Sequence, residues 1–129
     1  MNWKKTHTIG CGLHLLVGGL MIFAGSGKAL GFAPPEIVTK MAAIGLKDQI
    51  QLIGIGEIIA AVLLLIPATS VLGTLATSGF WGGVICLHMT RHEDYLFPSV
   101  LLAITWIAAS LRGSVELFRT SPDSKSASA

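Results

Sequence analysis

Four long apolar runs, separated by short links, limit what this chain can fold into. They cover about residues 9–30, 50–66, 71–87 and 95–111. A helix crosses the hydrocarbon layer of a bilayer in roughly 17 to 25 residues, so each run is long enough to span it. Hydrocarbon offers no partner for backbone polar groups, and separate runs of this length satisfy those groups as helices. We therefore predict an all-α protein with four transmembrane helices.

The composition agrees with a chain embedded in lipid. Charged residues make up 12% of the 129 residues, which is about half their share in an ordinary soluble domain. The apolar share is 52% and the mean hydropathy is +0.71, which is more apolar surface than so short a chain can bury in water. A net charge of only +2, with scattered basic residues, excludes nucleic acid as a partner.

The links between the runs predict the topology. Between the second and third runs, Pro67 ends one helix and Ser70 can cap the next. The link before the fourth run is also short, and Pro98 suits the first turn of the last helix. Helices joined in this way lie antiparallel and side by side. We predict one antiparallel four-helix bundle over residues 1–120 and a disordered tail over 121–129.

The longer link between the first two runs carries a helical pattern over residues 36–47. At 100° per residue, its apolar and polar side chains fall on opposite sides. We expect this segment to lie flat in the headgroup region as a short interfacial amphipathic helix. The apolar side holds Ile37, Val38, Met41, Ala42 and Ile44, and the polar side holds Glu36, Thr39, Lys40 and Lys47.

Orientation is only weakly encoded by the flanking charges. Five basic residues flank one face and four flank the other, and on the positive-inside rule we place both termini in the cytoplasm of a bacterial inner membrane. Residues 1–26 can also be read as a signal peptide, with Lys4 and Lys5 ahead of an apolar stretch. That stretch exceeds the roughly 7 to 15 residues of a signal core, so we expect a retained first helix.

Glu57 is the residue that most indicates a function, because it stands inside the second apolar run. An ionisable group within a span costs about 2.5–3.5 kcal/mol on insertion scales and normally faces the bundle interior with a partner. Helical rise counted from the shared surface puts Lys28 and His88 in the same half of the bundle. Trp81 comes level with Glu57 and would give a flat ligand an aromatic wall. The alternatives are a buried structural anchor for Glu57 and an ordinary core or lipid-facing position for Trp81.

The remaining histidines give weaker site predictions. His88 and His92 have the spacing of a metal-binding pair, but Arg91 would oppose a cation and zinc requires at least three protein ligands. His7 and His14 are expected to serve interfacial packing rather than to ligate haem. We therefore predict no metal site and no catalytic residue, and a quinone is the one cofactor that we keep open.

Gly79 and Gly83 form a GxxxG pattern in the third run. Small residues let helices approach closely in lipid. The pattern predicts tight packing within the bundle or a homodimer, and it does not distinguish between the two.

Several short motifs follow one another in a characteristic order along most of the chain. They are Phe23–Lys28 (FAGSGK), Met41–Leu46 ending in IGL, Ile53–Ile58 (IGIGEI), Leu63–Pro67 (LLLIP), Leu72-Gly73, Gly82–Ile85 (GGVI) leading to His88, and Phe97-Pro98 followed by Trp106. In order and spacing they resemble the DoxX-like family of small four-helix membrane proteins.

The resemblance implies a four-span fold and aligns Lys28, Glu57 and His88 with the polar pattern of that family. It implies less about function, because related proteins include a small subunit associated with thiosulfate and quinone oxidation, while many others have no assigned activity. This chain lacks a cysteine pair suited to sulfur redox chemistry.

We predict a non-catalytic membrane subunit, or a binder of a small quinone-like or lipid-like ligand, with a site formed by Lys28, Glu57, Trp81 and His88. One alternative is a membrane component of a quinone-linked oxidoreductase complex, in which a partner protein would supply electrons. Another is a small proton-coupled transporter, since small multidrug exporters also combine four spans with one membrane carboxylate. The expected partners are the lipid bilayer and either a second copy or another membrane protein.

Overall fold

The computed structural model describes residues 2–114. Within them four long helices are present, α1 (Trp3–Ala29), α3 (Ile50–Leu65), α4 (Ser70–Thr90) and α5 (Leu96–Arg112). The links hold a short helix, α2 (Pro35–Ala43), and two 3-10 turns, η1 (Lys47–Gln49) and η2 (Pro67–Thr69). These residues contain no strand, so the all-α prediction is confirmed. The predicted tail at 121–129 lies outside the described residues.

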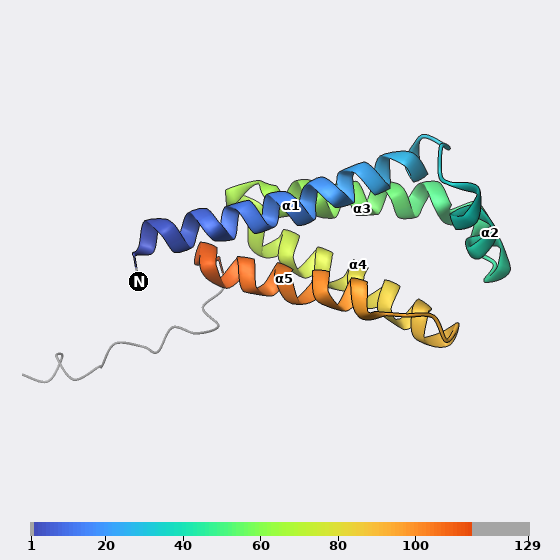
Figure 1. The fold of residues 1–129 in the computed structure, drawn as a ribbon. Helices are drawn as coiled ribbons and strands as arrows, with labels where there is room; N and C mark the ends of the chain where they lie inside the picture. Colours follow the sequence, from blue (N-terminus) through green and yellow to red (C-terminus); the bar gives the residue numbers. More distant parts are fainter. Residues whose placement is uncertain (1, 115–129) are drawn as a thin grey trace, which may run out of the picture.

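The four long helices form a ring in which each contacts two neighbours. In the side view of Figure 1, α1 and α3 lie above α4 and α5. α1 packs against α3 and α5, and α4 packs against the same two helices. Successive long helices run in alternating directions. The pair α1 and α3 lies close to the pair α4 and α5 near the N-terminus, and the two pairs diverge toward α2.

Each long helix turns a narrow stripe of residues toward the centre. The stripe recurs every three or four positions, as one face of a helix requires. In α1 it consists of Gly10, His14, Val17, Gly18, Met21 and Gly25, and in α5 of Pro98, Leu101, Thr105, Ala108, Ala109 and Arg112.

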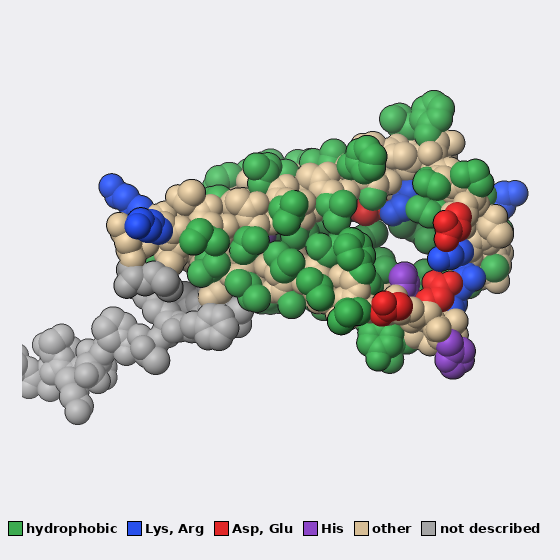
Figure 2. All heavy atoms as spheres, viewed as in Figure 1, with side chains coloured by type: hydrophobic (Ala, Val, Ile, Leu, Met, Phe, Trp, Pro, Cys, Tyr) green, Lys and Arg blue, Asp and Glu red, His purple; other side chains and the backbone are tan. Residues whose placement is uncertain are grey.

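Polar and apolar side chains are distributed as expected for a protein surrounded by lipid. Large apolar residues such as Phe23, Leu52 and Leu72 are exposed along the helices. Figure 2 shows apolar side chains covering the body of the molecule and charged side chains gathered toward its two ends. The interior holds the buried polar residues His14, Glu57, Ser70, Thr74, Thr77, Thr105 and Arg112.

Within residues 2–114, three helical segments are long and apolar enough to cross a membrane. They are Trp3–Ala29, Lys47–Leu65 and Pro67–Thr90, and α5 is a shorter apolar helix of 17 residues. The protein is therefore a membrane protein with three or more candidate spans.

The two largest differences from the predicted boundaries are the start of the first helix and the end of the short helix after it. The first helix begins at Trp3 rather than near residue 9, because the Asn2 side chain accepts a hydrogen bond from the backbone N–H of Lys4 and caps the helix. The helix predicted over residues 36–47 ends at Ala43.

The early end of α2 follows from a glycine. Gly45 has a left-handed φ of +74°, a conformation that costs glycine little. The backbone N–H of Leu46 donates to the carbonyl of Met41 over 2.9 Å, and that of Gly45 donates to the carbonyl of Ala42 over 3.1 Å. These two bonds form a Schellman motif, which ends a helix. The prediction was therefore wrong for the last turn of the segment.

Glycines set the distance between α1 and α3, but they are not those of the GxxxG pattern. A Cβ on Gly25 would lie 2.9 Å from the carbonyl oxygen of Gly54, and one on Gly54 would lie 2.6 Å from that of Gly25. By contrast, Cβ atoms on Gly79 and Gly83 would meet nothing within 4 Å. The GxxxG pattern therefore does not mediate helix packing within the described part of this chain.

Candidate functional site

An ion pair joins α1 to α3 in the half of the bundle nearer to α2. The Lys28 ammonium donates to Oε2 of Glu57 over 2.5 Å. The Glu57 side chain is only 2% exposed, and that of Lys28 is 12% exposed. A carboxylate at this depth requires a partner, and the neighbouring helix supplies one. The structure thus brings together two of the four residues that the sequence singled out.

The aromatic ring beside this ion pair belongs to Phe80. The Lys28 ammonium lies 5.6 Å from the centre of the Phe80 ring, within the range of a cation–π interaction. Trp81 packs edge-to-face against Phe80, with ring centres 5.2 Å apart, but it belongs to the hydrophobic core with Met21 and Leu64. The sequence analysis did not identify Phe80 as a site residue. The only signal for it in the sequence was its position next to Trp81.

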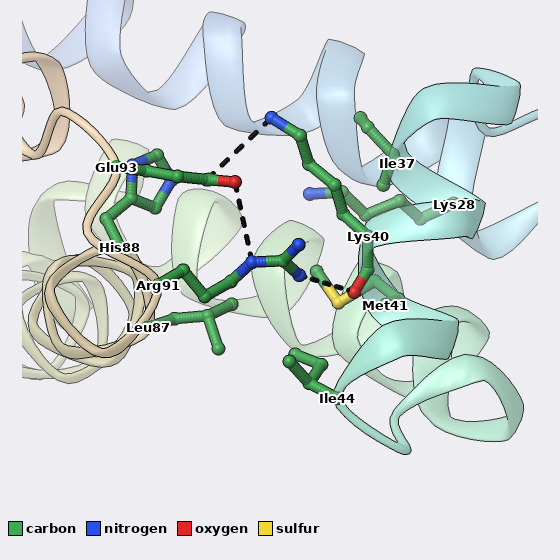
Figure 3. Close-up of a pocket in the computed structure, with 9 residues that line it drawn as sticks. All are labelled: Lys28, Ile37, Lys40, Met41, Ile44, Leu87, His88, Arg91 and Glu93. Atoms are coloured by element: carbon green, nitrogen blue, oxygen red, sulfur yellow. Dashed lines mark hydrogen bonds and ion pairs between the residues drawn. The ribbon is translucent and has the colours of Figure 1, made fainter.

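His88 lies at the C-terminal end of α4, facing a cavity that Lys28 also lines (Figure 3). Its Nδ1 is 2.7 Å from the carbonyl oxygen of Asp94. Because a carbonyl only accepts, Nδ1 must donate, which fixes the ring and leaves Nε2 available.

The cavity lined by Lys28 and His88, which we call the polar cavity, lies between α1, α2 and the end of α4. Its volume is about 190 Å³. Lys40 from α2 pairs with Glu93 over 3.7 Å, and Arg91 pairs with Glu93 over 3.4 Å. The Arg91 Nη1 also donates to the Lys40 carbonyl over 2.7 Å, so these contacts tie α2 to the link that follows α4 (Figure 3).

A second cavity, which we call the apolar cavity, adjoins the first and shares Lys28, Met41 and Leu87 with it. Its volume of about 320 Å³ falls at the lower end of the roughly 300–1,000 Å³ that ligand cavities occupy. Lys28 therefore stands where the two cavities meet. Trp81 lines neither of them. The other residues around the apolar cavity are Leu46, Ile53, Gly79, Phe80, Gly83 and Val84.

A second buried polar cluster lies toward the opposite end of the bundle. The Arg112 Nη1 donates to Nδ1 of His14 over 2.7 Å and to the carbonyl of Leu64 over 2.9 Å. The His14 Nε2 is 3.0 Å from the Thr105 carbonyl oxygen, so it carries the ring proton while Nδ1 accepts. The cluster joins α1, α3 and α5.

The structure corrects the sequence interpretation of this end. His14, expected at the interface, is fully buried, and Arg112, counted as a flanking charge, is only 9% exposed. The available signal was the spacing of Thr105, Ala108 and Arg112, which places the arginine on the buried stripe of α5.

The model of the DoxX-like family matches residues 12–108, which is more than half of the chain. The chain belongs to the DoxX-like family. This confirms the resemblance drawn from the motifs, and the matched region of this DoxX-like protein contains both cavities. No significant match was found among curated proteins or solved structures.

In this DoxX-like protein we expect Arg112→Met to lower the free energy of unfolding by roughly 1.5–3 kcal/mol, because it removes charged hydrogen bonds to His14 and Leu64. Lys5→Met is the matched control, since Lys5 is exposed on α1. Reversible unfolding in mixed detergent micelles, followed by circular dichroism, measures both variants. Equal stability of the two would show that the cluster does not hold the helices together.

Proposed function

We propose that this DoxX-like protein crosses the membrane four times as an antiparallel bundle and binds a small lipophilic ligand without catalysing a reaction on its own. The length of α5 supports the fourth crossing, since 17 residues is the lower limit of about 17 for a span. Its packing against both α1 and α4 also places it alongside helices that are long enough to cross.

The observation that carries the binding proposal is the position of Lys28, paired with Glu57, at the junction of two cavities. A lysine ammonium has three donors, and Glu57 uses one of them. The others can meet an oxygen of a ligand in the polar cavity, where His88 also presents its ring. Phe80 offers the ligand an apolar surface in the adjoining cavity. This combination suits a quinone-like or lipid-like molecule.

In this proposal Glu57 is a positioning residue. Its carboxylate holds the flexible Lys28 side chain at the junction of the cavities, so the lysine loses less conformational freedom when a ligand binds. Trp81 contributes to the site indirectly, because its edge-to-face packing holds the Phe80 ring in place.

We expect Glu57→Gln to weaken binding of a short-chain ubiquinone analogue or a copurified lipid by about tenfold, because the neutral amide no longer holds the Lys28 ammonium as a charged partner does. Asp48→Asn is the matched control, because Asp48 is an exposed carboxylate that lines neither cavity. Native mass spectrometry of the intact protein in mild detergent identifies copurified molecules, and titration gives the affinity. If a folded Glu57→Gln protein bound these molecules as well as wild type, the proposal would fail.

The same preparation separates the rival functions. A component of a quinone-linked oxidoreductase would copurify with a redox partner protein, and its quinone would be reduced when that partner received electrons. A proton-coupled transporter would move a cationic drug against a proton gradient in proteoliposomes. We expect neither result, because we assign Glu57 to the positioning of Lys28.

A further inference from the structure

We infer that the ligand is a single-chain amphiphile with an anionic head, whose head occupies the polar cavity and whose chain occupies the apolar cavity. The inference rests on the proposed function and names the chemical class of its ligand.

The charges around the polar cavity favour an anionic head. Three cationic side chains line it, those of Lys28, Lys40 and Arg91, against the single carboxylate of Glu93. Glu57 neutralises Lys28 from within the bundle. Lys40 and Arg91 both pair with Glu93, over 3.7 Å and 3.4 Å respectively. One positive charge is left in excess, and a monoanionic head would balance it.

A further carboxylate near this cavity does not remove the excess. Glu36 lies 3.4 Å from Lys40, one turn away on α2. Its side chain is exposed to water, however, where screening leaves such a pair weak. Lys40 and the guanidinium of Arg91 therefore supply the excess positive charge that an anion in the cavity would meet, beside the free donors of Lys28 (Figure 3).

The apolar cavity gives the hydrocarbon chain a path that starts at the head. The shared residues Lys28, Met41 and Leu87 form the junction. Beyond it, Gly79 and Gly83 leave open space over the backbone of α4, so a methylene chain can lie directly on the helix. A cavity at the lower end of the ligand range suits one chain better than two.

The test uses the whole 129-residue chain in lipid nanodiscs with two photoreactive probes of equal chain length, a diazirine-bearing dodecanoic acid and the corresponding dodecanol. We expect the acid to label α4 near Gly79–Leu87 about tenfold more strongly than the alcohol, because only the acid gains charge-assisted bonds. Mapping of the labelled peptides by mass spectrometry gives the site.

Two pairs of variants locate the chain and the head. Gly83→Leu should fill the apolar cavity and abolish labelling by the acid, whereas Gly82→Leu, on the same helix but lining neither cavity, should preserve it. Lys40→Gln should remove most of the preference for the acid, whereas Lys47→Gln, an exposed lysine in the same link, should not.

The possible failures are distinguishable from one another. Equal labelling by acid and alcohol, with both lost in Gly83→Leu, would overturn the anionic head and leave the proposed function standing. Binding of the ubiquinone analogue without site-specific labelling by either probe would overturn the amphiphile class alone. If neither probe nor the quinone analogue bound the site, the proposed function and the inference would fall together.

Discussion

Gly73→Ala should destabilise the protein by about 3 kcal/mol or more, at the upper end of what overpacking costs. Gly73 lies at the start of α4, where that helix crosses the end of α3. A Cβ there would overlap the backbone N and Cα of Leu64 and the carbonyl carbon of Leu63. Backbone atoms cannot rotate aside as a side chain can, so the two helices would have to separate. The short turn η2 restricts that separation.

The matched control for this substitution is Gly82→Ala on the same helix, where a Cβ meets nothing within 4 Å. That variant should be as stable as wild type or slightly more stable, since alanine favours a helix more than glycine does. Thermal unfolding in mild detergent compares the three proteins. Equal midpoints for the two alanine variants would contradict the close approach of α3 and α4.

The pairing of Lys28 with Glu57 illustrates what could be predicted from the sequence. The number of residues between each of them and the same membrane surface can be counted in the sequence. The rise per residue of a helix converts that number into a depth. Because consecutive helices alternate in direction, residues that lie at similar depths below one surface fall in the same half of the bundle. The short links separately predicted that α3 packs against α4 and α4 against α5, as the structure shows.

The rotation of each helix about its axis was much harder to predict. α4 is apolar on most of its surface, so its periodicity does not show that Trp81 faces the core while Phe80, about 100° away, faces Lys28. The role of Gly79 and Gly83 was equally hard to predict, because a small residue can either lie in a helix–helix contact or leave a groove on the helix surface. In this chain they line the apolar cavity.

The contact between His14 and Arg112 was missed for a different reason. The two residues lie 98 positions apart, and the contact depends on how α1 and α5 close the ring. Arginine at a helix end is usually a flanking charge, and a long side chain can turn either outward or inward. In the structure α1 approaches α5 closely at Gly10, where a Cβ would lie 2.8 Å from the Ala108 carbonyl oxygen, and His14 lies within hydrogen-bond distance of Arg112.

Lys28→Met should destabilise the protein by about 3–5 kcal/mol, because it leaves the Glu57 carboxylate buried without a cation. Glu57→Gln should cost less, since Lys28 is close to the end of α1 and its ammonium can move toward water. The double variant Lys28→Met/Glu57→Leu should regain most of the stability, because apolar replacement of a buried ion pair is often neutral. Unfolding of wild type, Lys28→Met, Glu57→Leu and the double variant in mixed micelles gives a complete double-mutant cycle, and Glu57→Gln is measured beside it.

This cycle also separates an anchoring role of the ion pair from a role in binding. An anchor contributes only stability, so a double variant that is folded should then behave as wild type in every assay. A binding site needs the Lys28 ammonium itself, so the same stable double variant should have lost its affinity for the ubiquinone analogue. We expect stability to return without binding, because two apolar side chains can fill the space between α1 and α3 but offer no donor at the junction of the cavities. Recovery of both properties would assign the pair to anchoring alone.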